Sequence, residues 1–92
     1  MQVWVGLGNP GTQYSMNRHN VGFMALDAMA EIHGFGPVQK KFSGWLQEGR
    51  IGPEKILLLK PATYMNESGR SVGEALRFYK LGLDALTVFH DE

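Results

Sequence analysis

Gln2–Leu7 reads QVWVGL and stops at the turn sequence GNPG of residues 8–11, and this stretch decides the fold. A short apolar run rich in β-branched and aromatic residues is typical of a strand that is buried on both faces. Such strands belong to largely parallel sheets, which need helices over both faces. The sequence therefore indicates an α/β protein.

Helices and strands alternate along the rest of the chain. Apolar residues recur at helical spacing from Asn20 to His33, and Gly34 is a natural helix stop. A second helix is expected from a cap at Asn66 or Ser68 to Leu81, with Gly82 as its stop. Further strands are expected at Phe42–Ile51, Lys55–Lys60 and Ala85–His90, the first two joined by the turn Gly52-Pro53-Glu54.

The resulting order is β-α-β-β-α-β, with one central mixed sheet flanked by helices. The first, third and fourth strands are expected to be parallel, because helices connect them as crossovers. The second strand is expected to be antiparallel and to lie at an edge. With 92 residues, the chain has room for one domain at most.

Composition excludes several classes of function. Nine Lys and Arg balance nine Asp and Glu, so the chain lacks the overall basic charge of a dedicated nucleic-acid binder, and any phosphate contact must be local. The absence of cysteine excludes a disulfide framework, a thiolate nucleophile and a Cys-based zinc site, and favours a cytoplasmic protein. The three histidines lack metal-ligand spacing, so no metal site is expected. No signal peptide or membrane span is expected either.

Four polar residues follow the strands that should be parallel, or precede the helices that come next. Because the carboxyl ends of parallel strands meet at one edge of a sheet, these side chains are expected to share a crevice. They are Asn9, His19, Asn66 and Asp91. A histidine with a nearby carboxylate and two amides provides a base, a group that orients it and neutral hydrogen-bond donors. This set indicates hydrolysis by an activated water, since no serine lies in a nucleophile-elbow motif.

Each of these residues also has a structural explanation. Asn9 is a common turn residue and Asn66 a common helix cap. His19 could form hydrogen bonds at a helix start, and Asp91 could be a solvated carboxylate near the chain end. For the other histidines, His33 and His90, the structural role is the stronger interpretation.

Gly6-Leu7-Gly8-Asn9-Pro10-Gly11 matches the spacing of a dinucleotide-binding loop, G-x-G-x-x-G. That loop requires a helix that opens within the motif and an acidic residue after the next strand. Here Pro10 and a further loop intervene, and Asp27, the acid at a suitable distance, lies inside the first helix. The match is therefore interpreted as accidental.

Four ordered motifs resemble the bacterial-type peptidyl-tRNA hydrolases. They are VGLGNPG at 5–11, NRHNVGF at 17–23, KPATYMNESG at 60–69 and HDE at 90–92. The resemblance implies an α/β protein that cleaves the ester between a stalled peptide and the 3′ end of tRNA, with no cofactor. It makes His19 the catalytic base and Asp91 the residue that holds its imidazole. By the same resemblance, substrate is held by Asn9, Tyr14, Met65, Asn66 and Tyr64, the last at a position where Phe is frequent.

Members of that family are roughly twice as long, so the resemblance implies that residues 1–92 are the N-terminal portion of a single domain. The resemblance implies a typically monomeric family, whereas an open sheet edge and uncovered helix faces favour association, so the sequence leaves the oligomeric state open. Two alternatives remain open: a non-catalytic RNA-binding relative and an inactive module of the same fold. Retention of His19, Asp91 and both asparagines argues against the RNA-binding relative, because a pure binder has no need of the whole set.

Overall fold

The computed structural model describes residues 1–7, 21–62 and 68–89. Within these ranges the strands are β1 (Gln2–Gly6), β2 (Gln39–Lys41), β3 (Gly44–Ile51), β4 (Glu54–Pro61) and β5 (Leu86–Phe89). The helices are α1 (Val21–His33), α2 (Ser68–Tyr79) and the short 3-10 helix η3 (Leu83–Ala85). None of the helices in the described ranges has the length and apolar character needed to cross a bilayer.

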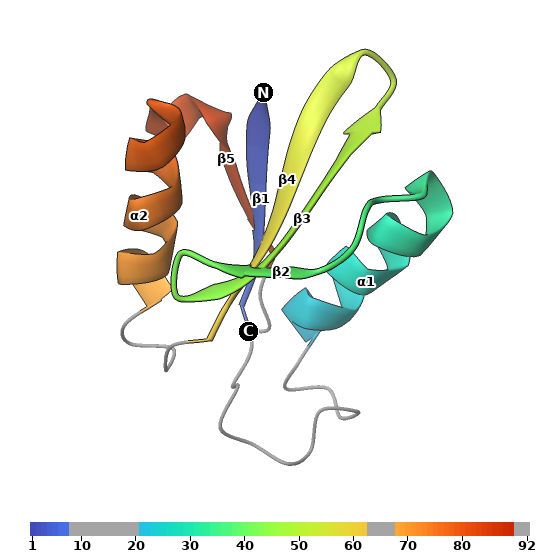
Figure 1. The fold of residues 1–92 in the computed structure, drawn as a ribbon, viewed down its shortest axis with the longest axis horizontal. Helices are drawn as coiled ribbons and strands as arrows, with labels where there is room; N and C mark the ends of the chain where they lie inside the picture. Colours follow the sequence, from blue (N-terminus) through green and yellow to red (C-terminus); the bar gives the residue numbers. More distant parts are fainter. Residues whose placement is uncertain (8–20, 63–67, 90–92) are drawn as a thin grey trace.

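The five strands form one mixed sheet in the order β2-β3-β4-β1-β5. β1 lies between β4 and β5 and is parallel to both, with Val5 opposite Leu59 on one side and Val88 on the other. β3 is antiparallel to β2 and β4. The α/β class and the parallel arrangement of the first, third and fourth predicted strands are thus confirmed. Figure 1 shows α1 and α2 on opposite faces of this sheet.

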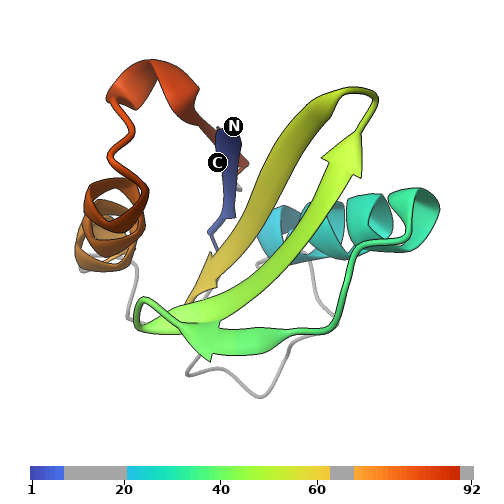
Figure 2. The same cartoon turned by 45° about the horizontal axis from the view of Figure 1, so that its top comes forward.

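The second predicted strand, Phe42–Ile51, needs a correction. The strand starts at Gly44, and Phe42 and Ser43 form the turn that joins β2 to β3. The sequence predicted neither this turn nor β2. β3 is therefore an inner strand, and β2 takes the edge (Figure 2). β2 reads QKK and all three of its residues are exposed, so no apolar pattern predicts it. Lysines are common on edge strands because they discourage further pairing.

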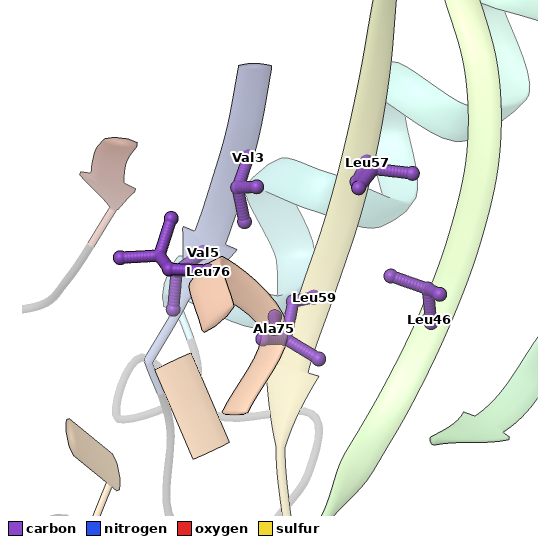
Figure 3. Close-up of a cluster of buried hydrophobic side chains, with 7 residues drawn as sticks. All are labelled: Val3, Val5, Leu46, Leu57, Leu59, Ala75 and Leu76. Carbon is purple, nitrogen blue, oxygen red and sulfur yellow. The ribbon is translucent and has the colours of Figure 1, made fainter. Parts of the chain in front are cut away.

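The core is split by the sheet into two layers. The α2 side buries residues of β1, β3, β4 and α2, shown in Figure 3: Val3, Val5, Leu46, Leu57, Leu59, Ala75 and Leu76. The α1 side buries Leu26, Ala30, Ile56 and Leu58. Residues 56–59 of β4 alternate between the layers and are at most 2% exposed. Full burial of a leucine stabilises the fold by about 2 kcal/mol, so β4 is the centre of the molecule.

The two main helices end by the same backbone motif at different residues. At the end of α1, Gly34 has φ 65° and the Phe35 N–H donates to the Ala30 carbonyl at 2.9 Å, so the predicted stop is confirmed. At the end of α2, Lys80 has φ 56° and the Leu81 N–H donates to the Leu76 carbonyl at 2.9 Å. This is a Schellman motif.

The α2 stop predicted at Gly82 is therefore wrong, because the helix ends at Tyr79. Leu81 packs against the core layer on the α2 side. We infer that this apolar contact fixes the end of α2 and forces Lys80 into a backbone conformation that glycine adopts more easily.

Candidate active site

The carboxyl ends of the three parallel strands meet at one edge of the sheet, which we call the carboxyl edge: Gly6 of β1, Pro61 of β4 and Phe89 of β5. Gly6 is opposite Phe89 in the ladder, and the Leu7 N–H donates to the Phe89 carbonyl at 2.9 Å. Both helices begin near this edge and run back along the sheet (Figure 1). Helix N-termini and strand ends are thus combined at one place, which is where ligands bind in open α/β sheets.

All of the predicted site residues lie outside the described residues. Asn9, Tyr14 and His19 belong to the connection from β1 to α1, residues 8–20. Tyr64, Met65 and Asn66 belong to the connection from β4 to α2, residues 63–67, and Asp91 follows β5. Each of these segments adjoins a strand end at the carboxyl edge. Their grouping around one crevice stays a prediction, as does the approach of Asp91 to the His19 ring.

The turn formed by Phe42 and Ser43 also stands at the carboxyl edge. Gly44 is paired with Pro61, so the turn lies beside the point where β4 ends. The Ala62 N–H, the first one after β4, donates to the Ser43 carbonyl at 2.8 Å. The sequence reasoning missed this turn, although Ser43-Gly44 is a dipeptide that often marks one.

Helix α2 holds the same turn through three kinds of contact. Ser71, with 0% exposure, donates from its Oγ to the Phe42 carbonyl at 2.5 Å. The Ser43 hydroxyl donates to the Glu74 carboxylate, at 3.2 Å and 3.3 Å from its two oxygens. The Phe42 ring lies 5.3 Å from that of Phe78 and 5.8 Å from that of Tyr79, centroid to centroid. These distances are typical of interacting aromatic pairs.

An ion pair ties the end of β4 to the other helix. Lys60, next to the last residue of β4, pairs with Asp27 of α1 through its ammonium group. The Lys60 side chain is only 17% exposed, whereas Asp27 is 61% exposed. The pair therefore fixes the lysine on the α1 side of the sheet, close to where the connection to α2 begins.

The remaining titratable groups near these contacts are few. Burial raises the pKa of Tyr79, the Glu48 carboxylate raises it further, and Lys55 lowers it. Lys40, Lys41 and Arg70 are exposed cations, and Arg18 lies outside the described residues. His33 is exposed at the last turn of α1, about 20 Å from the start of that helix at 1.5 Å per residue. In the part of the chain that the structure describes, no three His, Asp or Glu side chains gather as a metal site would require.

Comparisons with known proteins agree with this arrangement. Residues 3–92 match the family model described as peptidyl-tRNA hydrolase. The chain is 83% identical to the peptidyl-tRNA hydrolase of Novosphingobium aromaticivorans, with 100% of this chain and 48% of that protein covered. It is 71% identical to that of Erythrobacter litoralis, with 100% and 49% covered.

Among solved structures, the crystal structure of peptidyl-tRNA hydrolase from Acinetobacter baumannii matches with a TM-score of 0.89 at 40% identity, over 100% of this chain and 47% of that one. The chain thus spans about half the length of the relatives it matches. The match nevertheless extends over almost all of its residues, and on that basis the chain belongs to the peptidyl-tRNA hydrolase family.

Proposed function

We propose that the protein hydrolyses the ester bond between peptide and tRNA in peptidyl-tRNA, and so returns the tRNA to translation in the cytoplasm. One observation carries this proposal: β1, β4 and β5 end side by side at the carboxyl edge, and the motif residues lie in the segments next to those ends. Membership of the peptidyl-tRNA hydrolase family supports peptidyl-tRNA as the substrate. We take residues 1–92 as the N-terminal portion of a single domain.

In the proposed reaction, neutral His19 removes a proton from a water molecule as its oxygen attacks the ester carbonyl carbon. The Asp91 carboxylate orients the imidazole and stabilises the imidazolium that forms. The bond from the carbonyl carbon to the ribose oxygen then breaks, and the imidazolium returns its proton to that oxygen. The products are a peptide with a free carboxyl group and a tRNA with a free 3′ end. Acid–base assistance of this kind contributes about 10²–10⁴-fold to a rate.

The other motif residues bind substrate in this proposal. The amides of Asn9 and Asn66 hold the peptide and the water and donate to the oxyanion that develops at the carbonyl. Tyr14, Tyr64 and Met65 line the crevice with aromatic and apolar surface. The scheme uses only side chains and water, so it requires no cofactor and no metal.

The test is release of peptide from peptidyl-tRNA by the protein and by two histidine variants. We expect His19→Ala to lower kcat by about 10²-fold or more, because it removes the general base. His33→Ala is the matched control and should keep the wild-type rate, since His33 lies at the far end of α1. Binding of deacylated tRNA is measured alongside. Tight tRNA binding by a wild-type protein that releases no peptide would favour the RNA-binding alternative instead.

A further inference from the structure

We propose that the turn of Phe42 and Ser43 is a brace that positions the connection 63–67 by holding the residues on both of its flanks. That connection carries Tyr64, Met65 and Asn66, so the catalytic consequence of the brace rests on the proposed function. In this proposal the residues of the brace are positioning residues, because they act through the connection.

The flank on the β4 side is held by backbone contacts. The Ser43 carbonyl accepts from the Ala62 N–H at 2.8 Å, directly before the connection starts. Gly44 follows the turn and packs so closely on β4 that a Cβ there would lie 2.5 Å from the Lys60 carbonyl oxygen. The turn and the end of β4 therefore have little freedom to move apart.

The flank on the α2 side is held by side chains. Ser71, in the first turn of α2, donates to the Phe42 carbonyl, and Glu74 accepts from the Ser43 hydroxyl. The Phe42 ring contacts Phe78 and Tyr79 one to two turns further along. The same two residues of the turn thus bind the chain before the connection and the helix after it.

Backbone strain supports a functional reason for this arrangement. Phe42 and Ser43 both have φ 56°, in the left-handed region. Two-residue hairpin turns with this geometry favour Asn-Gly or Gly-Gly, and a bulky aromatic residue is unusual there. Such conformations persist only where surrounding contacts enforce them, and they cluster at functional sites. Here the enforcing contacts are the ones that fix α2 to the end of β4.

Positioning of this kind matters for catalysis, because a misplacement of about 1 Å can lower a rate by about 10²-fold. Five residues join Ala62 to Ser68, and both ends are held by one turn. A loosened brace would free Ala62 and the first turn of α2, which flank the segment that carries Asn66.

The experiment compares Phe42→Ala with Phe35→Ala in the protein. Phe35 is a matched control: it is also a half-buried phenylalanine next to the hairpin, but it packs on the α1 side of the sheet, over Gly49. Both variants remove one ring from one layer of the core. The first readout is hydrogen exchange of the backbone amides of residues 62–71, and the second is kcat and KM for peptidyl-tRNA.

We expect Phe42→Ala to speed exchange of these amides by about tenfold relative to Phe35→Ala. It should also lower kcat by about tenfold and raise KM, because the connection carries residues that hold the substrate in the proposed function. Phe42→Tyr keeps the ring, so its amide exchange and its kinetic constants should match those of wild type. A second pair of variants covers the case in which Phe42→Ala does not fold. Glu74→Ala should show the same change to a smaller degree, and Glu74→Gln, which keeps an acceptor for Ser43, should behave as wild type.

Equal effects of Phe42→Ala and Phe35→Ala on both exchange and kcat would overturn the inference, because the turn would then be merely structural. The two proposals fail differently. A wild-type protein that releases no peptide contradicts the proposed function, while the exchange comparison still decides whether the turn holds residues 62–71.

Discussion

The two hairpin turns at the ends of β3 both use positive φ, but the far turn has it at one residue and the turn at the carboxyl edge at two. Each has two residues between paired positions, Lys41 with Gly44 at the carboxyl edge and Ile51 with Glu54 at the far end. The far turn uses Gly52, with φ 63°, followed by Pro53, so the left-handed conformation costs little there. The turn at the carboxyl edge, which we call the edge turn, places both Phe42 and Ser43 at positive φ.

The residues of the far turn suit the backbone bend itself, whereas the residues of the edge turn make side-chain contacts with α2. Glycine at both positions of the edge turn would relieve the backbone, but it would remove the ring that contacts Phe78 and Tyr79 and the hydroxyl that binds Glu74. The side chains at the edge turn are therefore explained by what they hold, and those at the far turn by how the chain bends.

The largest expected effect comes from adding one methyl group at Gly44, beside the turn at the carboxyl edge, in comparison with Gly52, within the far turn. Gly44→Ala should lower the free energy of unfolding by about 3 kcal/mol, because the new Cβ would lie 2.5 Å from the Lys60 carbonyl oxygen and 2.9 Å from the Pro61 Cα, and backbone must move. Gly52→Ala meets no atom within 4 Å and suffers only from its positive φ, at about 1–2 kcal/mol. Urea unfolding of both variants measures the difference. A greater loss for Gly52→Ala would contradict the view that the edge turn is the tightly packed one.

The sequence predicts the fold well where burial decides it. The run KILLLK forms the central strand β4, and Gly34 ends α1, because both depend on local pattern and on apolar surface that must be covered. The strand β2 could not be predicted, since Gln39–Lys41 has no apolar face and forms only because β3 offers unpaired backbone groups. The end of α2 was placed wrongly because packing of Leu81 outweighed the preference for Gly82.

For the candidate site, the sequence predicts the meeting of strand ends but not the contacts around them. The parallel topology of β1, β4 and β5 follows from crossover rules, and the structure confirms it. The contact of Ser71 with Phe42 spans 29 positions and depends on how α2 is rotated on the sheet, which no local pattern determines. From the sequence, Ser71 is only a serine outside any nucleophile motif, and nothing there indicates its contact with Phe42.

A smaller effect is expected from glycine at two other left-handed positions. Lys80→Gly should raise the free energy of unfolding by about 0.5–1 kcal/mol, because glycine removes the cost of φ 56° at the end of α2 while adding some freedom to the unfolded chain. Ser43→Gly relieves the same strain but loses the hydroxyl bond to Glu74, so its gain should be smaller. Thermal unfolding measures both.

Peptide release then distinguishes the two glycine variants. Lys80 lies at the end of α2 away from the carboxyl edge, so Lys80→Gly should keep the wild-type kcat. Ser43→Gly should lower kcat in spite of its added stability, because it frees one contact of the brace. A wild-type kcat for Ser43→Gly would show that the hydroxyl contributes nothing to positioning.

The smallest expected effect is on the pH dependence of stability, and it concerns Tyr79, whose ring contacts Phe42. Burial raises the pKa of Tyr79 in the folded state above the value of about 10 expected in the unfolded chain. The unfolded chain therefore loses this proton first as pH rises, and the stability that Tyr79 contributes is fully present below pH 10 and is lost as pH rises through the folded-state pKa. We expect the free energy of unfolding to fall less steeply above pH 10 in Tyr79→Phe than in wild type, measured by urea unfolding at several pH values.

The two turns should differ in their effect on this slope. In Phe42→Ala the ring of Tyr79 is less buried, so the pKa of Tyr79 should be raised less and the free energy of unfolding should fall less steeply. Gly52→Ala should show the wild-type slope. If Tyr79→Phe shows the shallower fall but Phe42→Ala keeps the wild-type slope, the turn of Phe42 and Ser43 does not bury Tyr79, and the contrast between the two turns rests on backbone geometry alone.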